Sequence, residues 1–514
     1  METFKTIEEL VLKLHNTENS NIIYGAGIRG GRLWEFLRNK SIPVLAFMKT
    51  EKKLKREIDG LPVISLDEMV DDYELEHLNI IIAASEIICT DMKAELRKRG
   101  IDSFYEISEW VYDRILGELL IIRARNTAPI DRKYLDGKIV GYLSTEYVGV
   151  GYSEKRLVIN KIDGISYREL PRETYKFSNT DAGIEQDMKL YHWMIPAVYC
   201  PCDYAPDVDF IHTFNTVCDT DLPWCASFES GMPRMYAPET KVEKDFYLRL
   251  IDCMKRSNCR ALYPISEHAY KMQKKQLKNC LPAEDVNSLM QKTKVLYPPQ
   301  EILITEDEFE EKHNTDEVHF IFIGRTFFLK GGREMVQALS KFEGRTKFKL
   351  TLISSMLYND YYTHTSYDEM IRLRNLIQEK DWIDYYDHLS NEEVLNKCKT
   401  ATVGLLPSMA DSFGYAVLEM QAAGCPVVTT NVRALAEINN EECGWICRLP
   451  VDELGWCTER DSWSQKLQQE LEKCFENIFN EPKTVKEKGE KALMRIREIH
   501  NPLLYQNELR KNII

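Results

Sequence analysis

The sequence lacks any hydrophobic run long enough to cross a membrane, since no window comes near 18 uninterrupted apolar residues. Its first ten residues, METFKTIEEL, are polar and acidic and lack the apolar core that a secretory signal needs. We therefore expect the chain to stay in the cytoplasm. Peripheral contact with the inner face of the membrane stays open as an alternative.

Basic residues are in the minority. The chain has 67 Lys and Arg against 81 Asp and Glu, a formal net charge of −14. The electrostatic field of a chain with this excess of negative charge repels polyanions, so nucleic acid is not expected as a partner. Hydrophobic residues at 44% and charged residues at 29% are ordinary globular values, which exclude a disordered or fibrous chain.

The cysteines show no framework of paired spacings. Cys200 and Cys202 lie close in sequence, as do Cys443 and Cys447, but neither pair has a partner pair at the spacing of a zinc site. In a cytoplasmic chain, reduced structural thiols are the expectation.

What the chain does contain is a threefold succession of buried strands and helices, as its 514 residues suggest. We expect strands in the first unit at 21–24, 42–48 and 78–84. Those of the second are expected at 138–143, 208–212, 224–228, 261–265 and 294–298, and those of the third at 318–323, 349–354, 401–405 and 426–430. Ser65 with Glu68, and Ser390 with Glu393, are typical of capping boxes that open helices.

The fold class predicted is α/β, with three doubly wound Rossmann-like units. The boundaries predicted are 1–115 for a small Rossmann-like domain, 116–136 for a linker, 137–313 and 314–490 for two larger domains, and 491–514 for a C-terminal helix that returns to the second unit.

The most informative segment lies in the third unit. Asp411, Ser412, Phe413 and Gly414 precede a helix that carries Glu419. The first N–H groups of such a helix and its dipole favour a phosphate, and a glycine lets the backbone approach a ligand. Glu419 is placed to accept hydrogen bonds from ribose hydroxyls and Asp411 from sugar hydroxyls. In isolation, such an acidic pair is more often part of a solvated surface.

A second loop changes that balance. Gly324 and Arg325 follow another strand of the same unit and lead to Lys330-Gly331-Gly332. An Arg fork and a Lys point charge suit a diphosphate. Two phosphate-type loops at neighbouring strand ends of one parallel sheet predict a nucleotide-diphosphate site.

These residues resemble glycosyltransferase family 4, the retaining GT-B enzymes. The matching segments are Gly324-Arg325 with Lys330-Gly331, 389–394, 406–408, 411–419 and 423–428. The likeness is close over the third unit and loose over the second. The family motif is E-x7-E, so Asp411 keeps the charge but is one methylene shorter.

The resemblance implies that the last two units form a GT-B fold with a cleft between them. It also implies transfer of a sugar from UDP- or GDP-sugar to a glycan, lipid-linked or protein acceptor, with retention, in bacterial surface-glycan synthesis. Arg325 and Lys330 would bind the diphosphate, Glu419 the ribose and Asp411 the sugar. Gly324, Ser412, Phe413 and Gly414 would line the donor site, and no cofactor or metal would be required.

On the acceptor side the resemblance is looser. A loop with Gly149 and Gly151 would face the donor phosphates, and His212 and Glu229 are candidates for contact with the acceptor. Asp207-Val-Asp209 has the spacing of a Mg²⁺ pair but leads into a strand, which favours a structural turn. The basic stretch 271–278 is either a solvated helix face or a contact with an anionic membrane.

The N-terminal unit carries Gly25-x-Gly27-x-x-Gly30, which fits the dinucleotide fingerprint. Lys49 stands where that fingerprint has an acid, so we expect no NAD and favour a structural, docking or regulatory role. The unit resembles Rossmann-like domains appended to bacterial surface-sugar enzymes. Two rival functions stay open: an NAD-dependent sugar-nucleotide oxidoreductase or epimerase using this loop, and a catalytically silent GT-B scaffold.

Overall fold

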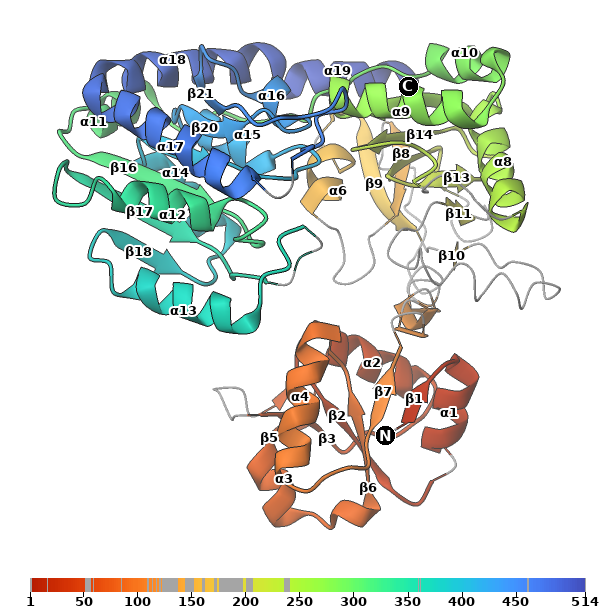
Figure 1. Cartoon of the computed structure of the whole chain (residues 1–514). Helices are drawn as coiled ribbons and strands as arrows, with labels where there is room; N and C mark the ends of the chain where they lie inside the picture. Colours follow the sequence, from red (N-terminus) through yellow and green to blue (C-terminus); the bar gives the residue numbers. More distant parts are fainter. Residues whose placement is uncertain are drawn as a thin grey trace. The chain divides into compact units, whose positions relative to one another are not determined.

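The chain divides into two compact units in the computed structural model, shown in Figure 1. The units comprise Met1–Ala226 with Pro233–Cys259, and Ser227–Met232 with Arg260–Ile514. The structure describes residues 2–513 except 16, 51–56, 59, 85, 109–110, 113, 117, 120–121, 123–136, 144–151, 160–161, 171–172, 175–196, 200–206, 235–240, 359, 361 and 460–461. None of the helices in these described residues is long and apolar enough to span a membrane.

The first sheet has seven strands in the order β1-β7-β6-β2-β3-β5-β4. All neighbours are parallel except the β4–β5 pair. Its strands are β1 (Glu2–Phe4), β2 (Ser20–Tyr24), β3 (Ala46–Lys49), β4 (Glu57–Ile58), β5 (Leu61–Ser65), β6 (Leu78–Ile82) and β7 (Tyr105–Ile107). Helices α1 (Ile7–His15) and α2 (Ile28–Asn39) pack on one face, and α3 (Leu66–Asp72) and α4 (Glu86–Lys98) on the other, with the 3-10 helix η1 (Leu75–His77) before β6.

The second sheet has five strands in the order β15-β14-β12-β8-β9, and the boundary between the two units passes through β14 and β15. Strand β8 is parallel to both β9 and β12. The bounds are β8 (Lys138–Leu143), β9 (Ile165–Leu170), β12 (Phe210–Phe214), β14 (Trp224–Phe228) and β15 (Cys259–Pro264). Nearby elements are α6 (Tyr152–Leu157), α8 (Lys241–Lys255) and a small sheet of β10 (Glu173–Thr174), β11 (Ala197–Tyr199) and β13 (Val217–Asp219).

The third sheet lies in the second unit and is parallel throughout, in the order β18-β17-β16-β19-β20-β21. Its strands are β16 (Val318–Ile323), β17 (Phe348–Ile353), β18 (Ile383–Tyr386), β19 (Val403–Leu406), β20 (Val427–Thr430) and β21 (Gly444–Cys447). The helices of this unit are α9 (Glu267–Cys280), α10 (Ala283–Gln291), α11 (Glu306–His313), α12 (Gly332–Ser340), α13 (Tyr367–Gln378), α14 (Asn391–Thr400), α15 (Tyr415–Ala422), α16 (Leu435–Ile438), α17 (Trp463–Asn480), α18 (Pro482–Ile499) and α19 (Pro502–Ile513).

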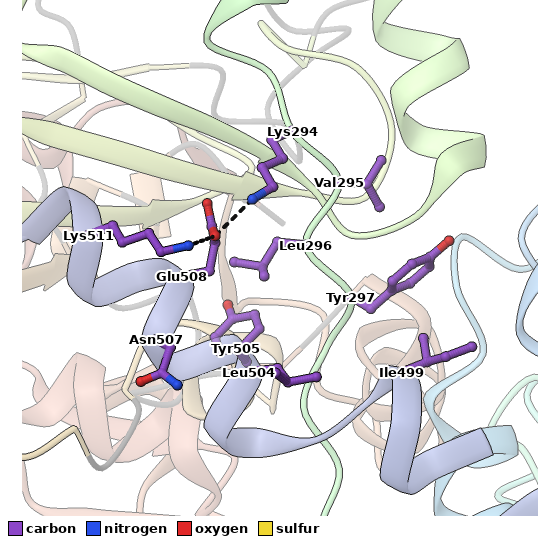
Figure 2. A pocket seen from close by; sticks show the side chains of 10 residues that line it. All are labelled: Lys294, Val295, Leu296, Tyr297, Ile499, Leu504, Tyr505, Asn507, Glu508 and Lys511. Carbon is purple, nitrogen blue, oxygen red and sulfur yellow. Dashed lines mark hydrogen bonds and ion pairs between the residues drawn. The ribbon is translucent and has the colours of Figure 1, made fainter. Parts of the chain in front are cut away.

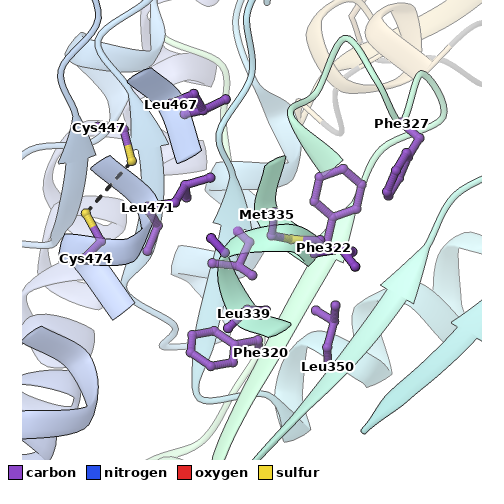
Figure 3. Packing of buried hydrophobic residues seen from close by; sticks show 14 of the residues in the cluster. Phe320, Phe322, Phe327, Met335, Leu339, Leu350, Cys447, Leu467, Leu471 and Cys474 are labelled. Atoms are coloured by element: carbon purple, nitrogen blue, oxygen red, sulfur yellow. Dashed lines mark hydrogen bonds between the residues drawn. The ribbon is translucent and has the colours of Figure 1, made fainter. Parts of the chain in front are cut away.

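Hydrophobic side chains from strands and helices meet on one face of this third sheet. Figure 3 shows Phe320 and Leu350 of the strands facing Leu339 of α12 and Leu471 of α17, all fully buried. Each such side chain contributes roughly 1.5–3 kcal/mol by leaving water. Strands as continuously apolar as these are typical of a sheet that is covered on both faces. Helix α15 packs on β19 and β20, and α18 lies against α15.

The predicted fold class, α/β with parallel sheets, is confirmed. Both capping boxes are present, Ser65 with Glu68 and Ser390 with Glu393. The last two helices begin at Pro482 and Pro502, because proline is favoured at the first position of a helix.

One predicted strand was wrong in extent, and another does not form. The strand expected at 42–48 starts only at Ala46, because Pro43 has no N–H to donate to a ladder. The segment 294–298 forms no strand: the N–H groups of Lys294 and Leu296 donate to Leu262 and Pro264, but only the bridge between Leu262 and Thr293 is regular. The prolines at 298 and 299 prevent the ladder from continuing.

The described cysteines are free thiols, and most are buried. Cys443 and Cys447, four positions apart in sequence, have different neighbours: the Cys443 thiol lies 3.6 Å from Asn439 Oδ1, and the Cys447 sulfur lies 3.9 Å from the Cys474 sulfur (Figure 3). Burial raises the pKa of the Cys443 thiol, and the Cys474 thiol and burial together raise that of Cys447, so both stay protonated and serve packing.

The burial of His319 in β16 should make the stability of the protein depend on pH. Burial lowers its pKa from 6.5 to about 4. Its ring nitrogens lie 3.0 Å from the Thr400 carbonyl and 2.8 Å from Thr351 Oγ1. At a pH between these two pKa values, His319 is protonated in the unfolded chain and neutral in the folded chain. The free energy of unfolding should therefore fall as pH drops through this window, by up to about 1.4 kcal/mol per pH unit for this group.

Urea unfolding at several pH values checks this. H319N should show a shallower decline on acidification than the unmodified protein. H388N, at an exposed histidine of the same unit, should keep the original slope. An H319N protein whose stability falls as steeply as the unmodified protein would contradict the assignment.

Candidate functional site

The strand order of the third sheet defines where a ligand would bind. From β16 the chain proceeds to β17 and β18 on one side, and from β19 to β20 and β21 on the other. The carboxyl ends of β16 and β19 therefore flank the topological switch point, the usual ligand site of an open α/β sheet. The loops 324–331 and 407–414 follow these two strands directly.

Both loops end in a glycine that opens a helix. Gly331, the N-cap of α12, has φ 75°, and Gly414, the N-cap of α15, has φ 96°. Neither helix has a side-chain cap among the described residues, whereas α9, α11, α13 and α14 of the same unit are capped by Ser or Thr hydroxyls. In neither helix does a side-chain oxygen of the described residues cap the first N–H groups, although the Gly332 N–H of α12 donates to the Phe327 carbonyl at 2.9 Å.

Only glycine fits at these two positions. A Cβ on Gly331 would lie 2.2 Å from the Pro407 carbonyl oxygen, so the two loops touch backbone to backbone. A Cβ on Gly414 would lie 2.7 Å from Leu435 Cδ2 and 3.1 Å from Ile438 Cδ1, both on α16. The left-handed backbone and the close neighbours exclude larger residues at once.

Hydrogen bonds join the two loops. The Met409 N–H donates to the Leu329 carbonyl at 2.9 Å. The Lys330 ammonium lies 2.5 Å from Asp411 Oδ2 and 3.3 Å from the Ala410 carbonyl. Asp411 also accepts from the Phe413 N–H at 3.1 Å, so its carboxylate links both loops.

The two predicted cations differ in setting. The Lys330 and Asp411 side chains are 18% and 12% exposed, which makes theirs a partly buried ion pair. Arg325 is exposed, and its guanidinium has no ion pair or hydrogen bond to any described residue. One cation is therefore fixed by the protein and the other is available to an incoming anion.

Ser412 makes a contact that the sequence did not predict. Its hydroxyl donates to Glu229 Oε2 at 2.9 Å, which brings an acid from the segment after β14 to the beginning of α15. Phe413 is fully buried, with its ring centroid 5.1 Å from that of Tyr415. No pattern at 229 signals this contact, because 183 residues separate the two side chains.

Glu419 lies in the second turn of α15 and is only 7% exposed. Its charge is near enough to Cys398 to help raise the pKa of that thiol, after burial and the Cys425 thiol. Helix α15 is apolar on nearly every side, so a carboxylate held at this depth is an unusual feature.

The remaining predicted site residues belong to the first unit. His212 lies in β12 and is buried, and burial lowers its pKa to about 3, so it is neutral at physiological pH. Gly149 and Gly151 lie outside the described residues. Of the predicted residues, the structure brings together Gly324, Arg325, Lys330 and Asp411–Gly414, with Glu419 in the adjoining helix.

Acidic groups with metal-like spacing have other partners. Asp207 pairs with Arg168 inside the first unit, and Asp209 accepts the Ile139 N–H at 2.9 Å, as a structural turn requires. Among the described residues, one group has ligand atoms close enough to hold a metal ion: Glu74, Glu76 and His77, all exposed and far in sequence from the switch-point loops. Exposed groups of this kind are common without an ion.

The N-terminal glycine loop has the geometry of its fingerprint. Gly25 has φ 123°, and a Cβ on Gly30 would meet the Gly25 carbonyl oxygen at 1.7 Å, whereas a Cβ on Gly27 would meet nothing within 4 Å. Nearby, a pocket of about 440 Å³ is lined by Thr50, Asp67, Ile88, Asp91, Met92, Glu95 and Arg99. Lys49 ends β3, as predicted, at the position where the fingerprint has an acid.

A separate pocket of about 670 Å³ lies between the segment 294–297 and α19 (Figure 2). Glu508 lies between Lys294 and Lys511, at 2.8 and 3.1 Å. None of the site residues predicted from the sequence lines it.

The basic stretch of α9 is exposed at Lys271, Lys274, Lys275 and Lys278, with Lys275 paired to Glu453 at 2.6 Å.

An open parallel sheet with two uncapped helix N-termini at its switch point is the arrangement of a nucleotide-binding α/β protein. Residues 304–456, which contain both loops, match the family model of Glycosyl transferases group 1.

Two curated relatives align with the chain over segments of similar length. An uncharacterized glycosyltransferase of Methanocaldococcus jannaschii is 28% identical over 147 residues, covering 28% of this chain and 36% of that protein. A D-inositol 3-phosphate glycosyltransferase of Paenarthrobacter aurescens is 31% identical over 127 residues, covering 24% and 29%. The chain thus spans about a third of the length of these relatives. Among solved structures, Anabaena HepE in complex with UDP and glucose aligns at a TM-score of 0.45 with 12% identity, over 73% of this chain and 99% of that one.

Gly414 provides a test of the packing at α15. G414A should destabilise the protein by about 1–3 kcal/mol, because it adds both left-handed strain and a clash with Leu435. G344A is the matched control: Gly344 has φ 72° but nothing within 4 Å of its added Cβ, so it should cost only about 1 kcal/mol. Urea unfolding measures both, and equal losses would argue against close packing of α16 on Gly414.

Proposed function

We propose that this protein is a retaining glycosyltransferase of the GT-B type, which transfers a hexose from a UDP- or GDP-sugar to a glycan, lipid-linked or protein acceptor. The observation that carries the proposal is the contact, through Lys330 and Asp411, of two switch-point loops that each end in a left-handed glycine N-cap, Gly331 and Gly414. The family match over residues 304–456 supports the same reaction class. A role in bacterial surface-glycan synthesis is the corresponding proposal for the pathway.

The diphosphate would lie between the two helix N-termini. Each offers first-turn N–H groups and the positive end of a helix dipole, which together favour an anion. Arg325, exposed and with no described partner, would fold over the phosphates as a bidentate donor. Lys330 would exchange part of its contact with Asp411 for a phosphate oxygen, because an ammonium has three N–H donors to share between acceptors.

The two acids would bind hydroxyls. Asp411, released in part from Lys330, would accept from the donor sugar, and Glu419 of α15 would accept from the ribose. Asp411 is shorter than the Glu of the family motif, and its bonds to Lys330 and the Phe413 N–H hold it close to the loop. We expect the donor sugar to lie correspondingly closer to α15.

In the proposed reaction, the bond between the sugar anomeric carbon and the leaving phosphate oxygen breaks. The acceptor oxygen bonds to that carbon on the same face, and its proton passes to the leaving phosphate oxygen, so a nucleoside diphosphate departs. The negative charge that grows on the diphosphate is the chief electrostatic demand. Arg325, Lys330 and the N-termini of α12 and α15 would meet it.

On the acceptor side we propose Glu229 and His212. Glu229 already accepts a hydrogen bond from Ser412 at the beginning of α15, so its carboxylate is suited to bind a sugar hydroxyl rather than a phosphate, which it would repel. His212 is neutral, so it would act as a hydrogen-bond partner and not as a charge.

Replacement of Lys330 is the most direct test. K330A should lower turnover of the preferred donor roughly a hundredfold, because it removes a charge that stabilises the leaving group. K341A is the control, at an exposed lysine just after α12 that pairs with Glu472, and should leave turnover unchanged. A thermal-shift screen of nucleotide sugars first identifies the donor, and transfer or donor hydrolysis is then measured by release of nucleoside diphosphate. Full activity in K330A would contradict the assigned site.

Metal dependence is a second test. The proposed site supplies its positive charge from Arg325, Lys330 and two helix N-termini, and both carboxylates of Asp207 and Asp209 have structural partners. Turnover should therefore be unchanged, within about twofold, after dialysis against EDTA and without added Mg²⁺ or Mn²⁺. Loss of activity with EDTA and its recovery with Mg²⁺ would overturn metal independence.

The two rival functions predict different results. A silent scaffold would show no turnover with any donor and acceptor tested. An oxidoreductase or epimerase would show nicotinamide absorbance and fluorescence in the purified protein.

A further inference from the structure

The Glu437 carboxylate, in the short helix α16, connects three segments that are distant in sequence. Its Oε1 accepts from the Glu267 N–H and from the Tyr297 hydroxyl, each at 2.6 Å, and its Oε2 accepts from the His268 N–H at 3.0 Å. Glu437 lies 170 residues from Glu267 and 140 from Tyr297. One side chain therefore gathers three donors.

This arrangement completes the beginning of α9. The Ser266 hydroxyl accepts from the Ala269 N–H at 3.0 Å, as an ordinary N-cap does. Glu437 takes the two preceding N–H groups, which α9 has no side chain of its own to bond. An anion at this point is also favoured by the positive end of the helix dipole.

The other face of α16 is packed against the proposed donor site. Leu435 and Ile438 lie against Gly414, as the Cβ distances of 2.7 and 3.1 Å show. The Gln421 side chain of α15 donates to the Ile438 carbonyl at 3.3 Å and to Asn439 Oδ1 at 3.2 Å. The position of α16 thus fixes the glycine turn that opens α15.

A neighbouring contact restrains the same connection. The Arg433 guanidinium lies 3.4 Å from His268 Nε2 and 4.4 Å from the centre of the Trp456 ring. Burial and then Arg433 lower the pKa of His268 to about 4, so at physiological pH its ring is neutral and can accept from Arg433. The chain just before α16 is therefore also held to the beginning of α9.

We propose that Glu437 is a positioning residue for donor binding: by holding α16 to α9 and Tyr297, it keeps Leu435 and Ile438 against Gly414 and so fixes the phosphate-facing N-terminus of α15. This inference rests on the proposed function, because it assumes that the nucleoside diphosphate binds at that N-terminus. It adds a residue outside the loops that would touch the donor.

A carboxylate is required at this position for a simple reason. All three partners of Glu437 are donors, so an amide of the same shape would place its own NH2 group against a donor. E437Q therefore keeps the volume of the side chain and breaks part of the contact. Y297F removes one donor and leaves the two backbone bonds.

The experiment compares E437Q and Y297F with E453Q. Glu453 is the matched control because it also connects α9 with the chain after β21, through Lys275 at 2.6 Å, but is 75% exposed and does not contact α16. UDP and GDP are titrated calorimetrically into the full chain, and the better binder is carried forward. Donor and acceptor KM are then measured with the matching nucleotide sugar.

We expect E437Q to weaken nucleoside diphosphate binding and raise donor KM about tenfold, the effect of losing one charge-assisted hydrogen bond. The acceptor KM should stay unchanged, Y297F should show a smaller effect in the same direction, and E453Q should match the unmodified protein. A purely structural role for Glu437 would lower the melting temperature of the free protein without changing nucleotide affinity, and that result would overturn the proposal.

Failure of the proposed function gives a different pattern. If the unmodified protein binds neither UDP nor GDP, the donor-site assignment itself is wrong. If it binds one of them and E437Q binds it equally well, only the role of Glu437 is wrong. An E437Q protein that does not fold leaves Y297F, which keeps both backbone bonds, to decide by the same two measurements.

Discussion

Two glycines in the left-handed conformation, Gly331 and Gly414, set the geometry on which the candidate site depends. Each ends a loop at the carboxyl edge of the third sheet and opens a helix without a side-chain cap among the described residues. Because neither residue has a Cβ, the backbones of the two loops can approach each other at Gly331, and the side chains of α16 can approach α15 at Gly414. The polar groups of the site are arranged around these contacts.

The charges follow from that backbone arrangement. Lys330 immediately precedes one glycine and Asp411 lies three residues before the other, so fixing the glycines brings their side chains to 2.5 Å. The ion pair with Asp411 keeps the Lys330 ammonium at the site and gives this partly buried charge a partner. Arg325, by contrast, stays exposed. A resting ion pair beside an available guanidinium suits the proposed binding and release of a dianion.

The contacts around Glu437 show how such a site is supported from outside. The donors at the start of α9 and at Tyr297 are far from the two loops in sequence, yet they determine where α16 lies against Gly414. Electrostatic stabilisation of a leaving group requires donors that are already in place, because reorientation during the reaction would cost part of the gain. Support of this kind is as much a property of the site as the residues that would touch the donor.

Much of this could be predicted from local sequence signals, and the physical reason is the same in each case. The apolar run of β16, the capping boxes at Ser65 and Ser390, and the glycine-rich loops at 324–332 and 411–414 report preferences that neighbours in sequence decide. The short strands β18 and β21 were not predicted, because their residues carry little local preference and pair only in the completed sheet. The strand expected at 294–298 does not form, because prolines follow it.

Contacts between Ser412 and Glu229, and between Glu437 and Tyr297, join residues more than a hundred positions apart. The sequence by itself determined the α/β class and the residue types of the two loops, since these depend on periodicity and backbone conformation. Only the tertiary structure decided which acid meets which donor, because that depends on the strand order that brings distant loops to one edge.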